Sequence, residues 1–480
     1  MKNIKLFTLF LILSIVFISL LPLSVPQAAA VSDIEAEANA AVLAEAATGN
    51  ILYAKNENAV IAPAGMVKII TALLAVEAYE NGDTALTDIV TVSDKAYNGL
   101  TAGSSSQVLE VGEEVSFEDL LYCILISSSN EACNAMAEYI SGDISAFVSL
   151  MNTRAAELGC TSTHFTNTHG LPDDDQYTTA NDIYLITEEA VKHPLFTEAS
   201  KAVTYTMPST NKSEARTLKT ANKLLIENNK YYYKYATGTK TGYTDSAGYC
   251  VVASAEKDGV YLISVVMGAE SIIDTDGSTL VKSYSETKRL LDWAFSSFGY
   301  RTILDTTMLV KEIPVSMGDG TDSVVLRPMT PVTAFLDNDI DTADFTFAIK
   351  LYSEGEELTA PVKAGDILGE VTVSLDGRIY GTSKLVANTN VALSRIIYLQ
   401  TEVAKIFSSL LVRIILSAFV LVITLYIFFV IRYNRNRKKR RAAERAEAER
   451  RRAEAIRQRK TTVGKSFEDI ETLHKGDRHR

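Results

Sequence analysis

Three short stretches combine polar side chains of kinds that proteins use in catalysis. Lys68 lies at the start of the apolar run "GMVKIITALLAVE", where burial would lower its pKa and make it a proton acceptor. A polar cluster, "SSSN" at residues 127–130, separates two apolar runs, and Lys240 precedes Thr241 and Gly242 where a β-hairpin is expected. Taken singly, a lysine at a helix start is usually a surface residue and a Thr-Gly pair is usually a turn, so the argument rests on their combination.

In this order and spacing, the three stretches resemble the motifs of the serine D-alanyl-D-alanine carboxypeptidases, the low-molecular-mass penicillin-binding enzymes (peptidase S11-like). That family carries S-x-x-K at a helix start, S-x-N between helices and K-T-G on a strand. "SSN" at 128–130 and "KTG" at 240–242 match the second and third motifs. Flanking stretches such as "GNILYAKNENAVIAPAGMVKIITALLAVE" and "THFTNTHGLPDDDQYTTANDI" are also similar, and the resemblance covers nearly all of residues 35–298.

The first motif departs from the family's pattern. Where the family has P-A-S-M-T-K, this chain reads "PAGMVK", so Gly65 stands at the nucleophile's position and Val67 replaces a threonine. In the family mechanism the serine attacks the carbonyl of the D-Ala-D-Ala bond, the lysine one helical turn later takes its proton, and an acyl-enzyme forms. The resemblance therefore implies that the attacking oxygen is missing.

The resemblance also assigns roles to the groups that remain. Lys68 is the proton acceptor, Ser128 relays a proton to the leaving D-alanine, and Asn130 orients these groups. Lys240 with Thr241 attracts the terminal carboxylate of the peptide, and the backbone N–H groups of residues 65 and 243 form the oxyanion hole, since glycine keeps its N–H. The predicted site comprises Gly65, Lys68, Ser128 and Asn130 for catalysis and Lys240, Thr241, Gly242 and Tyr243 for substrate binding.

The elements that would position these groups alternate in type along residues 31–298. Apolar and capping patterns predict helices at 66–80, within 117–142 and within 143–159, and strand-like runs surround the turns "TGN" and "KDG". Strands at both ends with helices between them predict an α+β domain with an antiparallel sheet, which the resemblance makes a penicillin-binding/β-lactamase-like transpeptidase domain. Residues 299–395 hold many short alternating runs and are expected to form a small all-β domain.

Both ends of the chain carry apolar segments that indicate a membrane. Residues 1–30 contain two lysines, an apolar run and an A-x-A-like end, which is the order of a secretory signal peptide; an uncleaved anchor is the alternative. The run at 406–431 is long enough to cross a bilayer as a transmembrane helix. The basic stretch "RYNRNRKKRR" follows it directly and predicts a single-pass protein with its main domains outside the cell membrane and its C-terminus in the cytoplasm.

Charge divides the chain between the two sides of that membrane. Residues 432–480 hold 18 Lys and Arg against 8 Asp and Glu, a net charge of +10, so the rest of the chain carries −22 of its total of −12. An acidic outer part excludes nucleic acid as a partner. Interleaved Glu and Arg in the basic tail predict a solvated helix, which either lies on anionic lipid headgroups or binds a cytoplasmic partner.

The cysteines and histidines indicate no metal site and no cofactor. The five histidines are scattered, and His169 in "NTHGL" is expected to be a turn residue rather than a catalytic one. The cysteines have no close-spaced pattern, so they are predicted to be buried thiols rather than a disulfide framework; they are Cys123, Cys133, Cys160 and Cys250.

Three functions remain open. The first is a membrane-anchored pseudoenzyme that binds D-Ala-D-Ala stem peptides of peptidoglycan in cell-wall biogenesis. Loss of a serine nucleophile costs ~2 × 10⁶ in turnover, roughly 8 to 9 kcal/mol, so such a protein would be catalytically impaired. The second is an active but weak D,D-carboxypeptidase that uses water activated by Lys68. The third is a scaffold that works through its transmembrane helix and tail.

Overall fold

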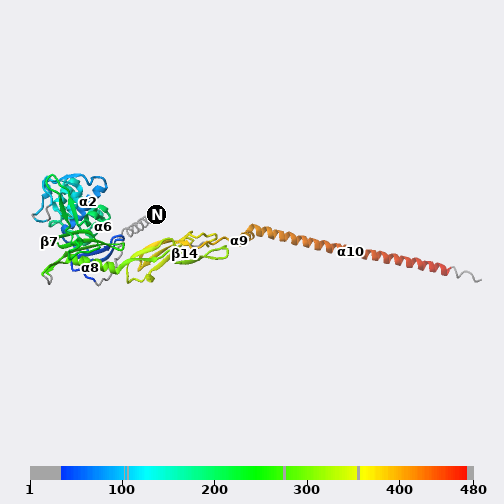
Figure 1. Ribbon diagram of the computed structural model, residues 1–480. Coiled ribbons are helices and arrows are strands. Elements are labelled where there is room, and N and C mark those ends of the chain that lie inside the picture. Colours follow the sequence, from blue (N-terminus) through cyan, green and yellow to red (C-terminus); the bar gives the residue numbers. More distant parts are fainter. Residues whose placement is uncertain (1–33, 102, 105–107, 274–276, 354–356, 473–480) are drawn as a thin grey trace, which may run out of the picture. The chain divides into compact units, whose positions relative to one another are not determined.

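The computed structural model describes residues 34–101, 103–104, 108–273, 277–353 and 357–472 (Figure 1). The predicted signal peptide, residues 1–30, lies outside them. The chain divides into two compact units. The first includes the residues up to Ile303 with Val332–Thr346 and Ser374–Gly381, and the second holds Leu304–Pro331, Phe347–Val373 and the residues from Thr382 onward.

The first unit is built on an antiparallel sheet of five strands in the order β2-β1-β9-β8-β7. β1 pairs with β9, so Val42 lies opposite Val265 and the two ends of the unit's main segment join in one sheet. The inner strands are apolar on both faces, as expected for strands with packing on each side. The five strands are β1 (Ala40–Glu45), β2 (Asn50–Lys55), β7 (Ala236–Thr244), β8 (Gly248–Lys257) and β9 (Val260–Ala269).

Helices from the middle of the chain cover one face of this sheet. Alternate sheet residues, including Val42, Val252 and Val265, belong to the same buried cluster as the apolar side chains of these helices. Alternation is expected because successive side chains of a strand point to opposite faces. The helices are α2 (Val67–Glu80), α3 (Phe117–Leu125), α4 (Asn130–Ser141), α5 (Ile144–Glu157), α6 (Ala180–Ala190) and α7 (Pro194–Lys201).

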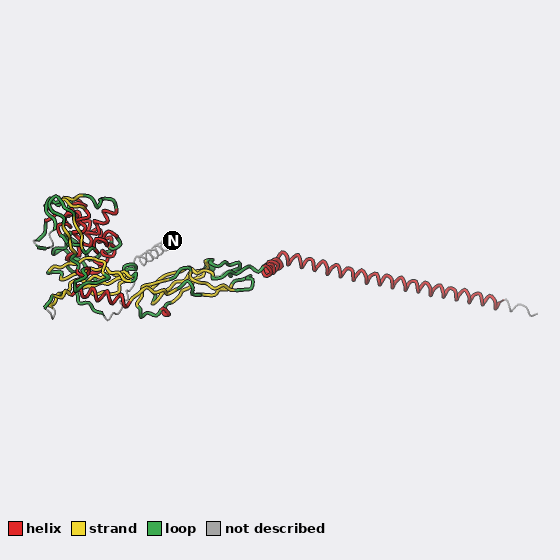
Figure 2. The backbone as a smooth tube through the Cα atoms, viewed as in Figure 1, coloured by secondary structure: helices red, strands yellow, loops and turns green. Residues whose placement is uncertain are grey.

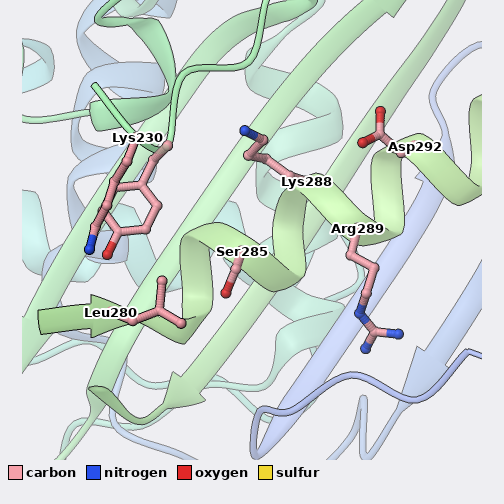
Figure 3. Close-up of a pocket in the computed structure, with 7 residues that line it drawn as sticks. Lys230, Leu280, Ser285, Lys288, Arg289 and Asp292 are labelled. Carbon is pink, nitrogen blue, oxygen red and sulfur yellow. The ribbon is translucent and has the colours of Figure 1, made fainter. Parts of the chain in front are cut away.

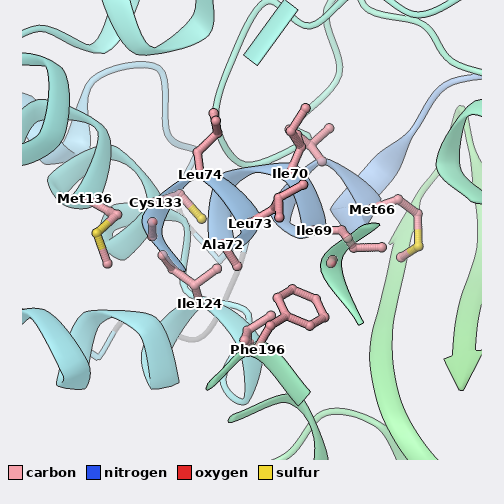
Figure 4. Close-up of a cluster of buried hydrophobic side chains, with 14 of the residues drawn as sticks. Met66, Ile69, Ile70, Ala72, Leu73, Leu74, Ile124, Cys133, Met136 and Phe196 are labelled. Atoms are coloured by element: carbon pink, nitrogen blue, oxygen red, sulfur yellow. The ribbon is translucent and has the colours of Figure 1, made fainter. Parts of the chain in front are cut away.

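Within this helical layer, α2 is almost completely enclosed. Its buried residues number 11 of 14, because the sequence VKIITALLAVEAYE is apolar around nearly the whole helix. Figure 4 shows Ile69 and Leu73 of α2 among side chains from neighbouring elements, including Ile124, Met136 and Phe196. Lys68, the second residue of α2, is therefore buried because the helix as a whole is buried.

A single helix, α8 (Lys282–Ser297), packs on the other face of the sheet among the described residues (Figure 1). Its apolar residues Leu290 and Leu291 share a second buried cluster with Leu43, Val251 and Ala253, which alternate with the sheet residues of the first cluster. The sheet is therefore the middle of three layers. This is the α+β arrangement that the sequence predicted, with strands at both ends and helices between.

Short strands pair outside the main sheet of the first unit. Ahead of α8 in the chain, β3 pairs with β4, β5 with β6 and β10 with β11, each pair forming a two-stranded antiparallel sheet. Their bounds are β3 (Ile89–Thr91), β4 (Glu114–Ser116), β5 (Thr204–Met207), β6 (Arg216–Lys219), β10 (Ser271–Ile273) and β11 (Thr279–Val281).

Strands and loops predominate from residue 298 to the start of the C-terminal helices (Figure 2). Five of the strands form a sheet in the order β13-β14-β18-β17-β16, and β12 pairs with β15. This agrees with the predicted all-β texture, whereas the domain bounds 299–395 stay a prediction, since the compact units divide after Ile303. The strands are β12 (Phe298–Leu304), β13 (Lys311–Pro314), β14 (Ser323–Pro328), β15 (Val332–Asp337), β16 (Thr346–Leu351), β17 (Ile367–Leu375) and β18 (Arg378–Ala387).

Two helices end the described chain, α9 (Arg395–Ser408) and α10 (Leu410–Thr472). Ser409 between them has an extended backbone, and its hydroxyl accepts a hydrogen bond from the N–H of Val412 at 3.3 Å, which caps the start of α10. The predicted span at 406–431 therefore begins inside α9, and its main part lies in α10. Within the described residues, α10 is the one helix long and apolar enough to cross a membrane.

The four cysteines have free thiols and are buried. Burial raises the pKa of Cys133 and of Cys250 to about 11 in each case. Such thiols stay protonated and unreactive near neutral pH. The prediction of buried thiols in place of a disulfide framework is confirmed.

Candidate active site

The N-terminal end of α2 places Lys68 in the interior. A short 3-10 turn, η1 (Ala64–Met66), leads into the helix, and Lys68 is only 3% exposed. Its Nζ donates hydrogen bonds to Oδ1 of Asn130 at 2.7 Å and to the carbonyl oxygen of His169 at 2.6 Å. Burial lowers the pKa of Lys68, because the charged ammonium loses its hydration. A lowered pKa is what a lysine needs in order to accept a proton.

The turn between α3 and α4 presents Ser128 and Asn130 together. Ser128 has a φ of +59°, an unusual backbone conformation for a residue other than glycine. Ser129 caps α4, since its hydroxyl accepts from the N–H of Ala132 at 3.2 Å. This leaves Ser128 free to meet strand β7, while Asn130, in the first turn of α4, contacts Lys68.

Lys240 reaches the same place from the sheet. It is 1% exposed, and its Nζ donates to the hydroxyl of Ser128 at 2.9 Å and to the carbonyl oxygen of Thr241 at 3.2 Å. Burial, together with the nearby charge of Lys68, lowers the pKa of Lys240 to about 7. The structure thus joins the three predicted motifs in one buried cluster with two lysines.

Gly65 lies against β7, at the edge of the main sheet. A Cβ atom built on Gly65 would lie 3.1 Å from the carbonyl oxygen of Thr241 and 3.3 Å from Cα of Gly242. A Cβ on Gly242 would lie 2.6 Å from the backbone nitrogen of Gly65. Both positions are glycine, so the start of the helix and the edge strand approach each other closely. Any side chain at residue 65 must displace β7 by a few tenths of an ångström.

The other predicted residues of β7 are placed differently from Lys240. Thr241 and Gly242 are half-buried, and their backbone atoms lie against Gly65 of η1. The Thr241 side chain instead hydrogen-bonds with Tyr284 of α8, and the Tyr243 side chain is 52% exposed. The hydroxyl of Tyr243 donates to Oδ1 of Asp245 at 2.8 Å, and its ring packs on Tyr249. The structure therefore brings six of the eight predicted residues into direct contact or close approach. Lys68 bonds Asn130, Lys240 bonds Ser128, and Gly65 lies against Gly242. Thr241 lies beside these residues in β7, and the Tyr243 side chain points outward.

Sequence reasoning missed the part that His169 takes in this cluster. Its carbonyl oxygen accepts from Lys68, and its ring Nδ1 accepts from the N–H of Leu171 at 3.2 Å, which holds the turn as expected. Burial and the charge of Lys68 lower the pKa of His169 to about 3, so the ring is neutral. In the sequence, the glycine that follows His169 is the one sign of this close packing. Gly170 has φ +91°, and a Cβ at this position would lie 1.8 Å from the carbonyl oxygen of Ala64.

Of two cavities lined by described residues of the first unit, one borders the cluster. One, of about 440 Å³, is lined by residues next to η1 and at the end of β7; they include Ala64, Gly170, Gln176, Thr244 and Ser246. The other, of about 510 Å³, is lined by side chains of α8 and of the segment opposite it, among them Lys230, Lys288, Arg289 and Asp292 (Figure 3). Only the first borders the predicted site, because α8 packs on the opposite face of the sheet.

Comparison with known proteins decides the family. A family model described as D-alanyl-D-alanine carboxypeptidase (peptidase S11) matches residues 26–271. The D-alanyl-D-alanine carboxypeptidase DacF of Bacillus subtilis is 33% identical over 357 residues, which cover 74% of this chain and 86% of that protein. The chain belongs to the D-alanyl-D-alanine carboxypeptidase family. DacC of Escherichia coli is 31% identical over 74% of this chain and 84% of its own length.

Solved structures confirm the fold of this D-alanyl-D-alanine carboxypeptidase family member. Penicillin-binding protein 6B from Escherichia coli is 26% identical, with a TM-score of 0.57 over 74% of this chain and 96% of that chain. Penicillin-binding protein 5 from Haemophilus influenzae is 29% identical, with a TM-score of 0.55 over 76% of this chain and 100% of that chain. The predicted penicillin-binding/β-lactamase-like fold is therefore correct.

Proposed function

We propose that this protein binds peptidoglycan stem peptides ending in D-Ala-D-Ala and is catalytically impaired, because Gly65 stands where the family's acylated serine would stand. The single observation that carries this is the set of partners of Lys68. Among the described residues, Asn130 and the carbonyl of His169 accept its hydrogen bonds, and residue 65, one turn earlier, has no side chain. In the part of the chain that the structure describes, no hydroxyl bonds to Lys68, so none is placed to give this amine its proton and become an alkoxide.

The hydroxyl of Ser128 is a poor substitute nucleophile. It accepts a hydrogen bond from Lys240 at 2.9 Å, whereas Lys68 bonds Asn130. Ser128 therefore faces the other lysine, in a position suited to relaying a proton to a leaving amine. In this proposal Asn130 orients Lys68, and Ser128 keeps its family role without being acylated.

Lys240 is the group that would recognise the peptide. A buried cation next to Thr241, on an edge strand, can meet the terminal carboxylate of D-Ala-D-Ala with charge-assisted hydrogen bonds. The exposed strand edge of Gly242 and Tyr243 offers backbone groups to an extended peptide. The N–H groups of residues 65 and 243 would receive the carbonyl oxygen, and the cavity that borders Ala64 and Thr244 gives room for the rest of the stem.

One observation favours a second candidate, a slow D,D-carboxypeptidase. Burial lowers the pKa of Lys68, so this amine can take a proton from a water molecule in the space that a serine side chain would fill. Without a covalent intermediate, only the residual ~10³ to 10⁴ over the uncatalysed rate is expected from binding and the oxyanion hole. Such activity would depend on Lys68 and would leave no acyl-enzyme.

For the anchor, the proposal is a single membrane crossing by the apolar part of α10. Leu410 to Ile431 would rise about 33 Å as a helix, which matches the hydrocarbon core. The basic stretch that follows favours the cytoplasmic side, and the exposed Glu447 and Arg451 of the tail form an i,i+4 ion pair at 3.1 Å. A scaffold that recruits a cytoplasmic partner through this tail is the remaining alternative.

A labelling experiment separates these functions. The full-length protein in detergent is incubated with a fluorescent penicillin and, separately, with a D-Ala-D-Ala peptide whose released D-alanine is measured. Impaired catalysis with retained recognition predicts no covalent label, no burst of D-alanine, and saturable binding of the peptide. A covalent label on the native protein would overturn impairment, and absence of peptide binding would overturn recognition and favour the scaffold.

A further inference from the structure

A second cluster of polar side chains lies at the opposite end of α2 from Lys68. Glu77, Glu189 and His193 each offer one ligand atom, and these atoms all lie within 4.8 Å of one another. Glu77 is near the end of α2, Glu189 is near the end of α6, and His193 precedes α7. Glu77 is nine residues beyond Lys68, about 13.5 Å along the helix axis, so this cluster is separate from the candidate active site.

His193 is arranged as a metal-binding histidine. Its Nδ1 lies 2.7 Å from Oε2 of Glu80, while its Nε2 is buried and has no hydrogen-bond partner among the described residues. In metal sites, a histidine commonly donates Nδ1–H to a carboxylate and binds the ion through the lone pair on Nε2, and the contacts of His193 fit that arrangement. Buried polar atoms normally have a partner, so the unpartnered Nε2 of a ring that belongs to this cluster points to a missing ligand.

The charge of the surroundings favours a cation. The three residues line a groove of about 580 Å³, whose charged lining consists of five carboxylates and one guanidinium; these are Glu77, Glu80, Asp83, Glu157, Glu189 and Arg154. Arg154 bonds Oε1 of Glu77 at 2.7 Å and Oε1 of Glu189 at 3.3 Å. Lys192 also bonds Oε2 of Glu189 at 2.9 Å, so a metal ion would share the carboxylates with Arg154 and Lys192 or displace these side chains. The five carboxylates of the lining exceed these two cations, which permits a further cation.

We propose that Glu77, Glu189 and His193 bind a divalent transition-metal ion of the Zn²⁺ type, with water completing a four-coordinate site. Imidazole nitrogen with two carboxylate oxygens is a ligand set that Zn²⁺ accepts, whereas Ca²⁺ and Mg²⁺ prefer oxygen alone. The ion links the ends of α2 and α6 to the segment before α7. It thereby stabilises the helical layer that holds Lys68, without taking part in chemistry there.

The test is a zinc titration of the full-length protein, purified in detergent without a histidine tag and stripped of metal. Competition with a chromogenic chelator is expected to show one Zn²⁺ per chain, and a metal-dependent rise in the thermal midpoint should accompany it. His193→Gln should abolish this binding. Glu80→Gln should weaken it 10- to 100-fold, the usual cost of losing the partner that orients a ligand.

Glu157→Gln is the matched control, since Glu157 lines the same groove and lies 3.3 Å from Arg154 without belonging to the ligand cluster. It should bind zinc as the native protein does. Absence of stoichiometric zinc binding would overturn the proposal, as would equal affinities of His193→Gln and Glu157→Gln, or displacement of Zn²⁺ by an equal concentration of Ca²⁺. Glu80→Gln keeps the histidine, so it provides an independent result if His193→Gln does not fold.

Discussion

Gly65→Ser is the substitution that most directly examines the candidate active site. It returns a hydroxymethyl group to the position one helical turn before Lys68, whose pKa is already lowered by burial. The expected gain is large, because a serine nucleophile is worth ~2 × 10⁶ in turnover, roughly 8 to 9 kcal/mol. We expect the variant to form a covalent adduct with a fluorescent penicillin, whereas the native protein does not.

The structure also sets the cost of this change. The new Cβ would lie 3.1 Å from the carbonyl oxygen of Thr241, where ordinary van der Waals contacts begin near 3.4 Å. β7 must therefore move by about 0.3 Å, an overpacking penalty of roughly 1 to 3 kcal/mol. Because a folded domain is typically stable by about 5 to 15 kcal/mol, the variant should stay folded and its acylation should be observable, while the thermal midpoint should fall by several degrees.

Gly65→Ala is the matched control, because it introduces the same Cβ without the hydroxyl. It should lose as much stability as Gly65→Ser and acquire no label. Adding Lys68→Met to Gly65→Ser should abolish the label, since the hydroxyl then has no proton acceptor. The assay is gel fluorescence with intact-protein mass spectrometry to count adducts. If folded Gly65→Ser protein remains unlabelled while it still binds the peptide, the assignment of residue 65 to the nucleophile's position is wrong.

Three further measurements address recognition, packing and topology. The charged form of Lys240 binds the carboxylate, and the pKa of Lys240 is lowered to about 7. Peptide affinity measured by calorimetry should therefore fall as the pH rises above 7, by up to tenfold per pH unit. Lys240→Met should bind weakly and without this pH dependence, and a native affinity that rises with pH would contradict the assignment. Leu73 of α2 is fully buried, so Leu73→Ala should lower the free energy of unfolding, measured by denaturant titration, by about 2 to 5 kcal/mol. Leu309 is 64% exposed, so Leu309→Ala should cost less than about 0.5 kcal/mol. Equal costs would refute the packing argument. The native thiols are buried, so a maleimide should react only with an introduced cysteine. On intact cells, a membrane-impermeant maleimide should label Asp339→Cys and should not label Glu444→Cys. Labelling of Glu444→Cys would exclude a cytoplasmic tail.

Each motif of the candidate site is short and continuous in sequence. The sequence alone predicts Lys68, Ser128, Asn130 and Lys240, and the structure brings these residues within hydrogen-bond distance as two pairs. The carbonyl of His169 could not be predicted in the same way. A backbone oxygen has no residue-type signature, and its position depends on how the turn at Gly170 packs on Ala64.

The apolar and turn patterns predict which helices and strands form better than they predict the residues at which these begin and end. The enclosed helix at 66–80 appears as α2, Val67–Glu80, because an apolar sequence on all sides demands burial. The break at Ser409 was missed, since an apolar run does not reveal a helix boundary inside it. The serine hydroxyl that caps α10 could instead have formed an ordinary i−4 contact in a continuous helix.

By itself, the sequence determined the family, the order of strands and helices, the two apolar segments at the ends, and the absence of a serine at residue 65. Only the tertiary structure decided how close β7 lies to Gly65, which partners each buried lysine has, and that Glu77, Glu189 and His193 converge. These three residues are more than 100 positions apart at their extremes, so no spacing rule relates them. Their proximity arises from the packing of α2 against α6, a long-range property that local patterns do not encode.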